Sequence, residues 1–188
     1  MLAVLTGPVR SGKSSAGLRL AISSGLPVTI AVGGRADDEE MCRRIERHQV
    51  ERPSGITVLE TAEAGWQERV GDDACLLVDC LGTVLGSQLW SLVPDDAEVA
   101  GEEAERQAER IADDLVAWLM AREAPTVVVS NEVGWGVVPA TPLGRLFRDV
   151  LARATRRLVD EADGAWLVVA GRCIDMTTHP QEVAWPHK

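Results

Sequence analysis

A glycine-framed pattern near the start of the chain constrains the fold more than any other feature. It reads Gly7-Pro8-Val9-Arg10-Ser11-Gly12-Lys13-Ser14. The apolar run 2–5 before it predicts a buried strand, and the segment 14–24 after it predicts a helix that ends before Gly25. A strand, a loop with these glycines and a helix, in that order, form the phosphate-binding unit of P-loop proteins. The chain is therefore expected to fold around this unit.

The same pattern predicts a nucleoside triphosphate as ligand. The glycines let several backbone N–H groups point at one phosphate, and the helix N-terminus adds positive potential. Lys13 can reach the terminal phosphates, where it would act in catalysis, and the Ser14 hydroxyl can bind Mg²⁺. Lys13 and Lys188 are the two lysines among 19 basic residues, which fits a need for a compact ammonium group at this position. The nucleotide-binding set predicted from the loop is Gly7, Pro8, Val9, Arg10, Ser11, Gly12, Lys13 and Ser14.

Strands and helices are predicted to alternate along the rest of the chain. The predicted strands are 28–32, 56–59, 74–78, 126–129 and 165–170, and the predicted helices are 36–51, 61–70, 81–92, 102–122 and 142–160. Because the strands are apolar on both faces, they favour a mostly parallel sheet covered by helices on both sides. We therefore predict an α/β P-loop NTPase fold in a single domain over residues 1–188, with an irregular tail over about 171–188.

One face of the predicted helix 102–122 carries Ile111, Leu115, Trp118 and Leu119 at helical spacing. These side chains are expected in the core rather than at a cofactor.

An acidic residue, Asp79, ends the apolar run 74–78. In P-loop proteins an acid at such a strand end holds Mg²⁺, usually through water. The alternative is an ordinary acid at the end of a strand. With the loop upstream, the metal role is favoured, and Ser14 and Asp79 form the predicted magnesium site.

Composition limits the partners and the location. The net charge of −10 argues against a duplex nucleic-acid binder, which needs a basic face. Cys42, Cys75, Cys80 and Cys173 show no Cys-x-x-Cys spacing, so neither a zinc site nor a disulfide framework is expected. No basic segment precedes the first apolar run, and no uncharged apolar stretch has the length of a membrane span. The sequence therefore predicts a cytoplasmic protein.

A histidine lies among arginines in the predicted helix 36–51. Arg44 comes one turn before His48, and Arg52 would come one turn after it, so the three could bind a polyphosphate. A neutral imidazole, with a reference pKa of about 6.5, could attack an α-phosphorus and form a nucleotidyl-histidine. On these residues alone a structural or solvated histidine is the simpler interpretation.

Five groups of residues occur together in the order typical of one family. They are Thr6-Gly7 with Arg10-Ser11-Gly12-Lys13-Ser14; Glu40-Met41, Arg44-Ile45, His48 and Arg52-Pro53; Val78-Asp79-Cys80-Leu81; Ser130-Asn131-Glu132-Val133-Gly134 with Gly136-Val137-Val138-Pro139; and Phe147-Arg148-Asp149. From about residue 2 to residue 171 the chain resembles the bifunctional adenosylcobinamide kinase/adenosylcobinamide-phosphate guanylyltransferases of cobalamin biosynthesis.

This resemblance implies a RecA-like P-loop fold, a homotrimer, a corrinoid substrate and ATP or GTP with Mg²⁺. It implies phosphorylation of adenosylcobinamide, then transfer of GMP from GTP through His48 with release of pyrophosphate. Arg44, Arg52 and Glu60 join the nucleotide-binding set. Glu132 has a possible second acidic role toward metal or substrate, and the alternative is a loop acid that orders the turn.

The chain departs from the family pattern at Pro8 and Val9, at Ile56, and over 82–88, where the family has Thr-Leu-Trp-Leu-Ser-Asn. Pro8 removes one backbone N–H from the loop. Two alternatives therefore stand beside the bifunctional enzyme. One is a diverged P-loop kinase of small molecules with a single activity, and the other is a non-catalytic GTP-binding regulatory protein.

Overall fold

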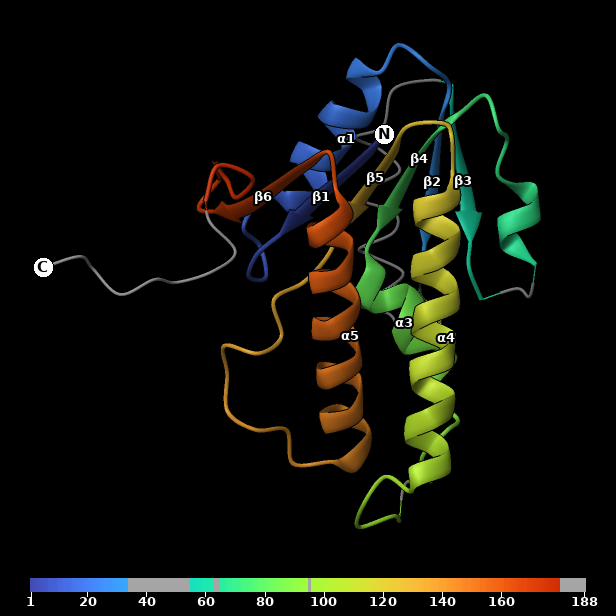
Figure 1. The fold of residues 1–188 in the computed structure, drawn as a ribbon, viewed down its shortest axis with the longest axis vertical. Helices are drawn as coiled ribbons and strands as arrows, with labels where there is room; N and C mark the ends of the chain where they lie inside the picture. Colours follow the sequence, from blue (N-terminus) through green and yellow to red (C-terminus); the bar gives the residue numbers. More distant parts are fainter. Residues whose placement is uncertain (34–54, 63–64, 95, 180–188) are drawn as a thin grey trace, which may run out of the picture.

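The computed structural model describes residues 1–33, 55–62, 65–94 and 96–179 (Figure 1). Its strands are β1 (Leu2–Thr6), β2 (Val28–Val32), β3 (Ile56–Glu60), β4 (Cys75–Asp79), β5 (Thr126–Val129), β6 (Gly164–Val169) and β7 (Arg172–Asp175). Its helices are α1 (Lys13–Ser23), the 3₁₀ helix η1 (Trp66–Arg69), α3 (Leu81–Leu89), α4 (Glu102–Ala121) and α5 (Pro142–Glu161). The predicted helix 36–51 lies outside the described residues.

The described strands form one sheet in the order β3-β2-β4-β5-β1-β6-β7. Every neighbouring pair is parallel except β6 and β7, which are antiparallel. Strand β5 lies between β1, which leads into the glycine loop, and β4, which ends in Asp79. The mostly parallel sheet is therefore confirmed, and the architecture is an α/β fold in which the glycine loop follows β1.

Two hydrophobic layers cover the sheet, one on each face. Helix α1 lies on one face, and α3, α4 and α5 lie on the other (Figure 1). Side chains alternate along a strand, so Leu76 and Val78 of β4 join the layer under α3–α5, whereas Leu77 joins the layer under α1. This two-sided burial explains why the strands are apolar throughout.

Helices α4 and α5 pack side by side on the outer layer. Leu115 and Leu119 of α4 are buried, and Ile111 and Trp118 are partly buried against the same core, as their spacing predicts. The ring of Trp118 meets that of Trp66 edge to face, with centroids 5.2 Å apart.

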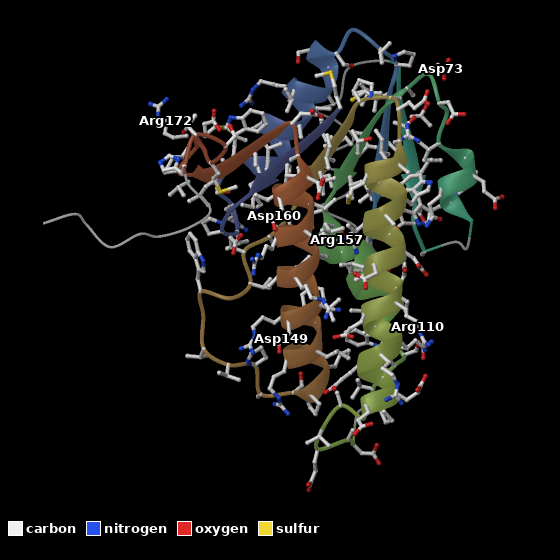
Figure 2. The ribbon with its side chains drawn as sticks, in the orientation of Figure 1. Asp73, Arg110, Asp149, Arg157, Asp160 and Arg172 are labelled. Atoms are coloured by element: carbon white, nitrogen blue, oxygen red, sulfur yellow. The ribbon has the colours of Figure 1, made fainter. Side chains whose placement is uncertain are left out.

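Ion pairs join the outer edges of α4 and α5. Arg157 of α5 extends toward α4 (Figure 2), where its Nη1 lies 3.0 Å from Oδ1 of Asp113. One turn away, Arg153 Nη1 lies 2.7 Å from Oε1 of Glu109. These side chains are largely exposed, so the pairs orient the two helices and contribute little to stability.

The predicted helix 61–70 is wrong, because the described residues there form only the 3₁₀ helix η1. Gly65 precedes it with a left-handed φ of 73°, and Val70 follows it in an extended conformation. Because the backbone is not helical at Gly65 or at Val70, only one short 3₁₀ helix forms between them.

The predicted irregular tail also begins too early. Strand β7 pairs with β6 through a tight turn in which Ala170 and Gly171 both have positive φ, at 49° and 74°. A two-residue hairpin turn needs positive φ at both residues, but Ala-Gly lacks the asparagine or aspartate that usually indicates such a turn.

The approach of β2 to α3 gives a test of the packing. A Cβ on Gly33 would lie 2.2 Å from backbone atoms of Thr83 and Val84. We expect Gly33→Ala to lower the free energy of unfolding by about 1–3 kcal/mol, since backbone must move to relieve the overlap. Urea unfolding measures the change.

Gly86→Ala on α3 is the matched control. Its Cβ would lie 3.6 Å from Phe147, an ordinary contact, so this variant should be unchanged or up to about 1 kcal/mol more stable. Equal midpoints for the two variants would contradict the packing described here.

Candidate active site

The loop between β1 and α1 has a backbone that requires its glycines. Gly7 has φ 149° and Gly12, which caps α1, has φ 99°. A Cβ on Gly7 would lie 2.2 Å from the carbonyl oxygen of Val168 in β6. Arg10 also has a positive φ, of 56°, and its side chain is exposed. The loop therefore curls tightly against β6, as a phosphate-binding loop must.

The polar side chains of the loop point into its interior. Lys13 is only 5 % exposed, and its Nζ donates a hydrogen bond of 2.7 Å to the carbonyl oxygen of Pro8. The Ser11 hydroxyl is buried and has no hydrogen-bond partner within the described part of the chain. A buried hydroxyl rarely stays unpaired, so a phosphate oxygen on this loop would satisfy it. These features fit the predicted triphosphate site.

The two predicted magnesium ligands meet at the edge of the sheet. Ser14 lies in the first turn of α1 and Asp79 ends β4. Ser14 Oγ donates a hydrogen bond of 2.9 Å to Asp79 Oδ1. Mg²⁺ binds oxygen at about 2.0–2.1 Å in octahedral geometry, so neighbouring ligand oxygens are about 2.9 Å apart. Within the described residues no group of three or more His, Cys, Asp or Glu side chains could hold a metal. Oxygens of phosphate and water would complete the Mg²⁺ coordination shell, as they generally do at sites that bind substrate phosphates.

A second acidic residue lies beside the loop. Glu132 follows β5, and its carboxylate Oε1 accepts a hydrogen bond of 2.5 Å from Thr6 Oγ1. The Glu132 backbone N–H donates a bond of 3.0 Å to the carbonyl oxygen of Gly7. Thr6 belongs to the first family motif, but the sequence pattern assigned it no role.

The residues before Glu132 join β5 to the helix layer. Ser130 is buried, and its Oγ lies 2.6 Å from Oγ1 of Thr155 in α5. Asn131 Nδ2 donates to Cys80 Sγ, directly after Asp79, at 3.4 Å. The segment 130–132 therefore contacts α5, the start of α3 and the loop in succession. Motif order pointed to this segment, but no sequence signal assigned its partners.

One predicted site residue that the structure describes, Glu60, is not brought to the loop. Glu60 is exposed at the end of the edge strand β3, with β2, β4 and β5 between it and β1. Four strand spacings separate β3 from β1, which is about 19 Å. Arg44, His48 and Arg52 lie outside the described residues.

An apolar pocket of roughly 360 Å³ opens between α3 and α5. Gly86, Leu89 and Trp90 line it from the α3 side, and Leu143 and Phe147 line it from α5. Trp90 is 73 % exposed there. Helix α3 thus connects the carboxylate of Asp79 at its start with an apolar surface at its end.

The loop, the buried lysine and the Ser14–Asp79 pair define a P-loop protein that binds nucleoside triphosphates. The family model described as "Cobinamide kinase / cobinamide phosphate guanyltransferase" matches residues 3–176. The chain belongs to this family.

Two curated relatives match almost end to end. The bifunctional adenosylcobalamin biosynthesis protein CobU of Salmonella typhimurium is 34 % identical over 182 residues, covering 91 % of this chain and 97 % of its own length. The corresponding CobP of Pseudomonas aeruginosa is 37 % identical over 177 residues, covering 93 % and 90 %.

Among solved structures, the type III secretion ATPase EscN of enteropathogenic E. coli has a TM-score of 0.47 at 15 % identity, covering 90 % of this chain and 43 % of that one. The RadB recombinase has a TM-score of 0.42 at 14 % identity, covering 88 % and 73 %. At these scores the fold assignment rests on the strand order itself. In the described part of the chain, no helix combines the length and apolar character that crossing a membrane requires.

The position of Lys13 gives a test of the phosphate site. We expect Lys13→Met to weaken triphosphate binding by about 10- to 150-fold, which corresponds to the roughly 1.5–3 kcal/mol of a charged hydrogen bond. Binding of a nucleoside monophosphate should change much less, because the terminal phosphates are missing. Isothermal titration calorimetry with GTP and GMP measures both.

The matched control is Arg19→Met, which removes one positive charge from an exposed position of the same helix. Its GTP affinity should stay within about twofold, since an exposed charge is screened by salt. Similar losses in both variants would mean that Lys13 acts only through overall charge.

Proposed function

We propose that this chain phosphorylates adenosylcobinamide with a nucleoside triphosphate and then transfers GMP from GTP to the product, giving adenosylcobinamide-GDP. Membership of the family supports the pair of reactions. The observation that carries the proposal is the Ser14–Asp79 contact beside the glycine loop, in a chain that this family's model covers from residue 3 to residue 176. A homotrimer and a cytoplasmic location stay predictions.

In the kinase step, the loop holds the triphosphate by its backbone N–H groups and by Lys13. Ser14 and Asp79 would hold Mg²⁺, which neutralises charge on the phosphates when it is bound. Positioning and charge stabilisation supply most of the catalysis in phosphoryl transfer, so these groups need only keep the terminal phosphate fixed and accessible. Arg10, exposed on the loop, adds a positive charge at its rim.

In the transfer step, an imidazole nitrogen of His48 attacks the α-phosphorus of GTP and the bond to pyrophosphate breaks. A phosphate oxygen of adenosylcobinamide phosphate then attacks the same phosphorus, and the phosphorus–nitrogen bond breaks to release His48. Arg44 and Arg52 would bind the phosphates during both displacements. The family resemblance supports this assignment, together with the spacing of the three residues in the sequence.

Metal dependence tests the kinase site. We expect Asp79→Asn to raise the Mg²⁺ concentration for half-maximal kinase activity by about tenfold or more, because the amide has no negative charge for the ion. Kinase rates over a Mg²⁺ series measure the shift. Asp73→Asn, an exposed carboxylate far from the loop (Figure 2), is the matched control and should leave the series unchanged. Superimposable curves for Asp79→Asn and wild type would remove the metal role from Asp79.

Covalent labelling tests the transfer step. With Mg²⁺ and GTP labelled at the α-phosphate, the wild type should acquire a label that is labile in acid and stable in base, as a phosphorus–nitrogen bond is. His48→Ala should acquire none, because the nucleophile is gone.

His179→Ala is the control for the transfer step. His179 is exposed in the turn after β7, where its Nδ1 lies 3.0 Å from the carbonyl oxygen of Asp175, so this variant should label like the wild type. An unlabelled wild type that still binds GTP would leave a single-activity kinase or a GTP-binding regulatory protein.

A further inference from the structure

Glu132 occupies the gap between the phosphate loop and the metal acid. Strand β5 is paired on both sides, and its last residue, Val129, is in register with Leu5 of β1 and with Asp79 of β4. All three strands are parallel, so their carboxyl ends meet at one edge. Glu132, three residues past Val129, therefore lies at this edge beside Gly7, to which its backbone is bonded.

One oxygen of the carboxylate is fixed. Thr6 is 4 % exposed, and its hydroxyl donates to Oε1 of Glu132 at 2.5 Å. The backbone bond to Gly7 fixes the main chain of the same residue. The carboxylate is thus held at two points against the start of the loop, and its rotation is restricted.

The other oxygen of the carboxylate, Oε2, has no partner among the described residues. Within the described part of the chain, Oε2 of Glu132 makes no hydrogen bond and the carboxylate makes no ion pair. The side chain is half-buried, so this oxygen faces partly into solvent at the edge of the sheet. A fixed carboxylate with a free oxygen is the arrangement that a proton acceptor requires.

Among the described residues, the site built so far lacks such an acceptor. The loop amides, Lys13 and the Ser11 hydroxyl supply donors for phosphate oxygens, and Asp79 is engaged by Ser14. Phosphoryl transfer to an alcohol also needs a group that orients the alcohol and takes its proton. Of the carboxylates that the structure describes beside the loop, Glu132 is the one that the metal pair leaves unused.

We propose that Glu132 is the catalytic base of the kinase step. The acceptor hydroxyl of the substrate donates to Oε2, its oxygen forms a bond to the terminal phosphorus, and the bond from that phosphorus to the β-phosphate oxygen breaks. The proton passes to the Glu132 carboxylate and then to solvent, while the nucleoside diphosphate leaves. Thr6 is a positioning residue, because it acts only by holding Oε1. The identity of the alcohol rests on the proposed function.

The variant Glu132→Gln tests the base. The amide keeps the size of the side chain and can still accept the Thr6 hydrogen bond, but it cannot take a proton. We expect kcat for phosphorylation of cobinamide to fall about 10²- to 10⁴-fold, with KM for the triphosphate within about threefold. Slow hydrolysis of the triphosphate without acceptor should fall as well, because water then takes the place of the alcohol. Triphosphate affinity and covalent labelling from α-labelled GTP should stay within about threefold of the wild type.

Thr6→Val tests the positioning. It removes the hydroxyl and keeps the shape, so the carboxylate stays present but less well held. The kinase kcat should fall by about three- to tenfold, between the wild type and Glu132→Gln, since misplaced catalytic groups lose only part of their effect.

The outcomes separate the two proposals. If Glu132→Gln keeps the wild-type kinase and hydrolysis rates, Glu132 is not the catalytic base. An equal loss of triphosphate binding, labelling and kinase activity also overturns it, because Glu132 would then only support the loop. A wild type that hydrolyses triphosphate but does not phosphorylate cobinamide contradicts the proposed function alone. In that case the hydrolysis rate of Glu132→Gln still decides the role of Glu132.

Discussion

The parallel register of β4, β5 and β1 is the constraint on which the site depends. Val129 pairs with both Leu5 and Asp79, so the ends of these strands lie at one edge of the sheet. The loop, the metal acid and Glu132 each follow one of these strand ends. Because the strands are buried on both faces, a shift of register would move core side chains as well as the site. The fold and the site are therefore stabilised by the same contacts.

The sequence predicted the parts of the site that are contiguous. The loop, the helix after it and the strand before Asp79 each carry a local signal, and the structure brings Ser14 and Asp79 together as predicted. The Thr6–Glu132 bond joins residues 126 positions apart, and no local pattern encodes a pair of that kind. Strand β7 was missed for another reason, since its turn has the backbone of a hairpin without the usual residues.

Two departures from the family pattern acquire a physical meaning in the structure. Pro8 lacks an N–H that could bind phosphate. Its carbonyl oxygen accepts a hydrogen bond from Lys13 Nζ and so holds the ammonium group inside the loop. On α3, Gly82 and Gly86 both face Phe147, at 3.6 Å from the position of a Cβ. A Cβ at Gly82 would also come within 3.2 Å of Leu151, so glycine there lets α3 lie close to α5. Gly86 lines the apolar pocket. Apart from the N–H that Pro8 lacks, the departures alter the surroundings of the site and leave the Lys13 and Ser14 contacts in place.

Two polar atoms beside the loop lack a hydrogen-bond partner among the described residues, and they differ in their exposure to solvent. The Ser11 hydroxyl is buried without a partner in the described residues, which costs free energy in the absence of ligand. Oε2 of Glu132 is partly solvated, so its lack of a protein partner costs far less. A phosphate oxygen that bonds the Ser11 hydroxyl would therefore recover that free energy. Oε2 of Glu132 stays solvated at little cost until an acceptor hydroxyl reaches it.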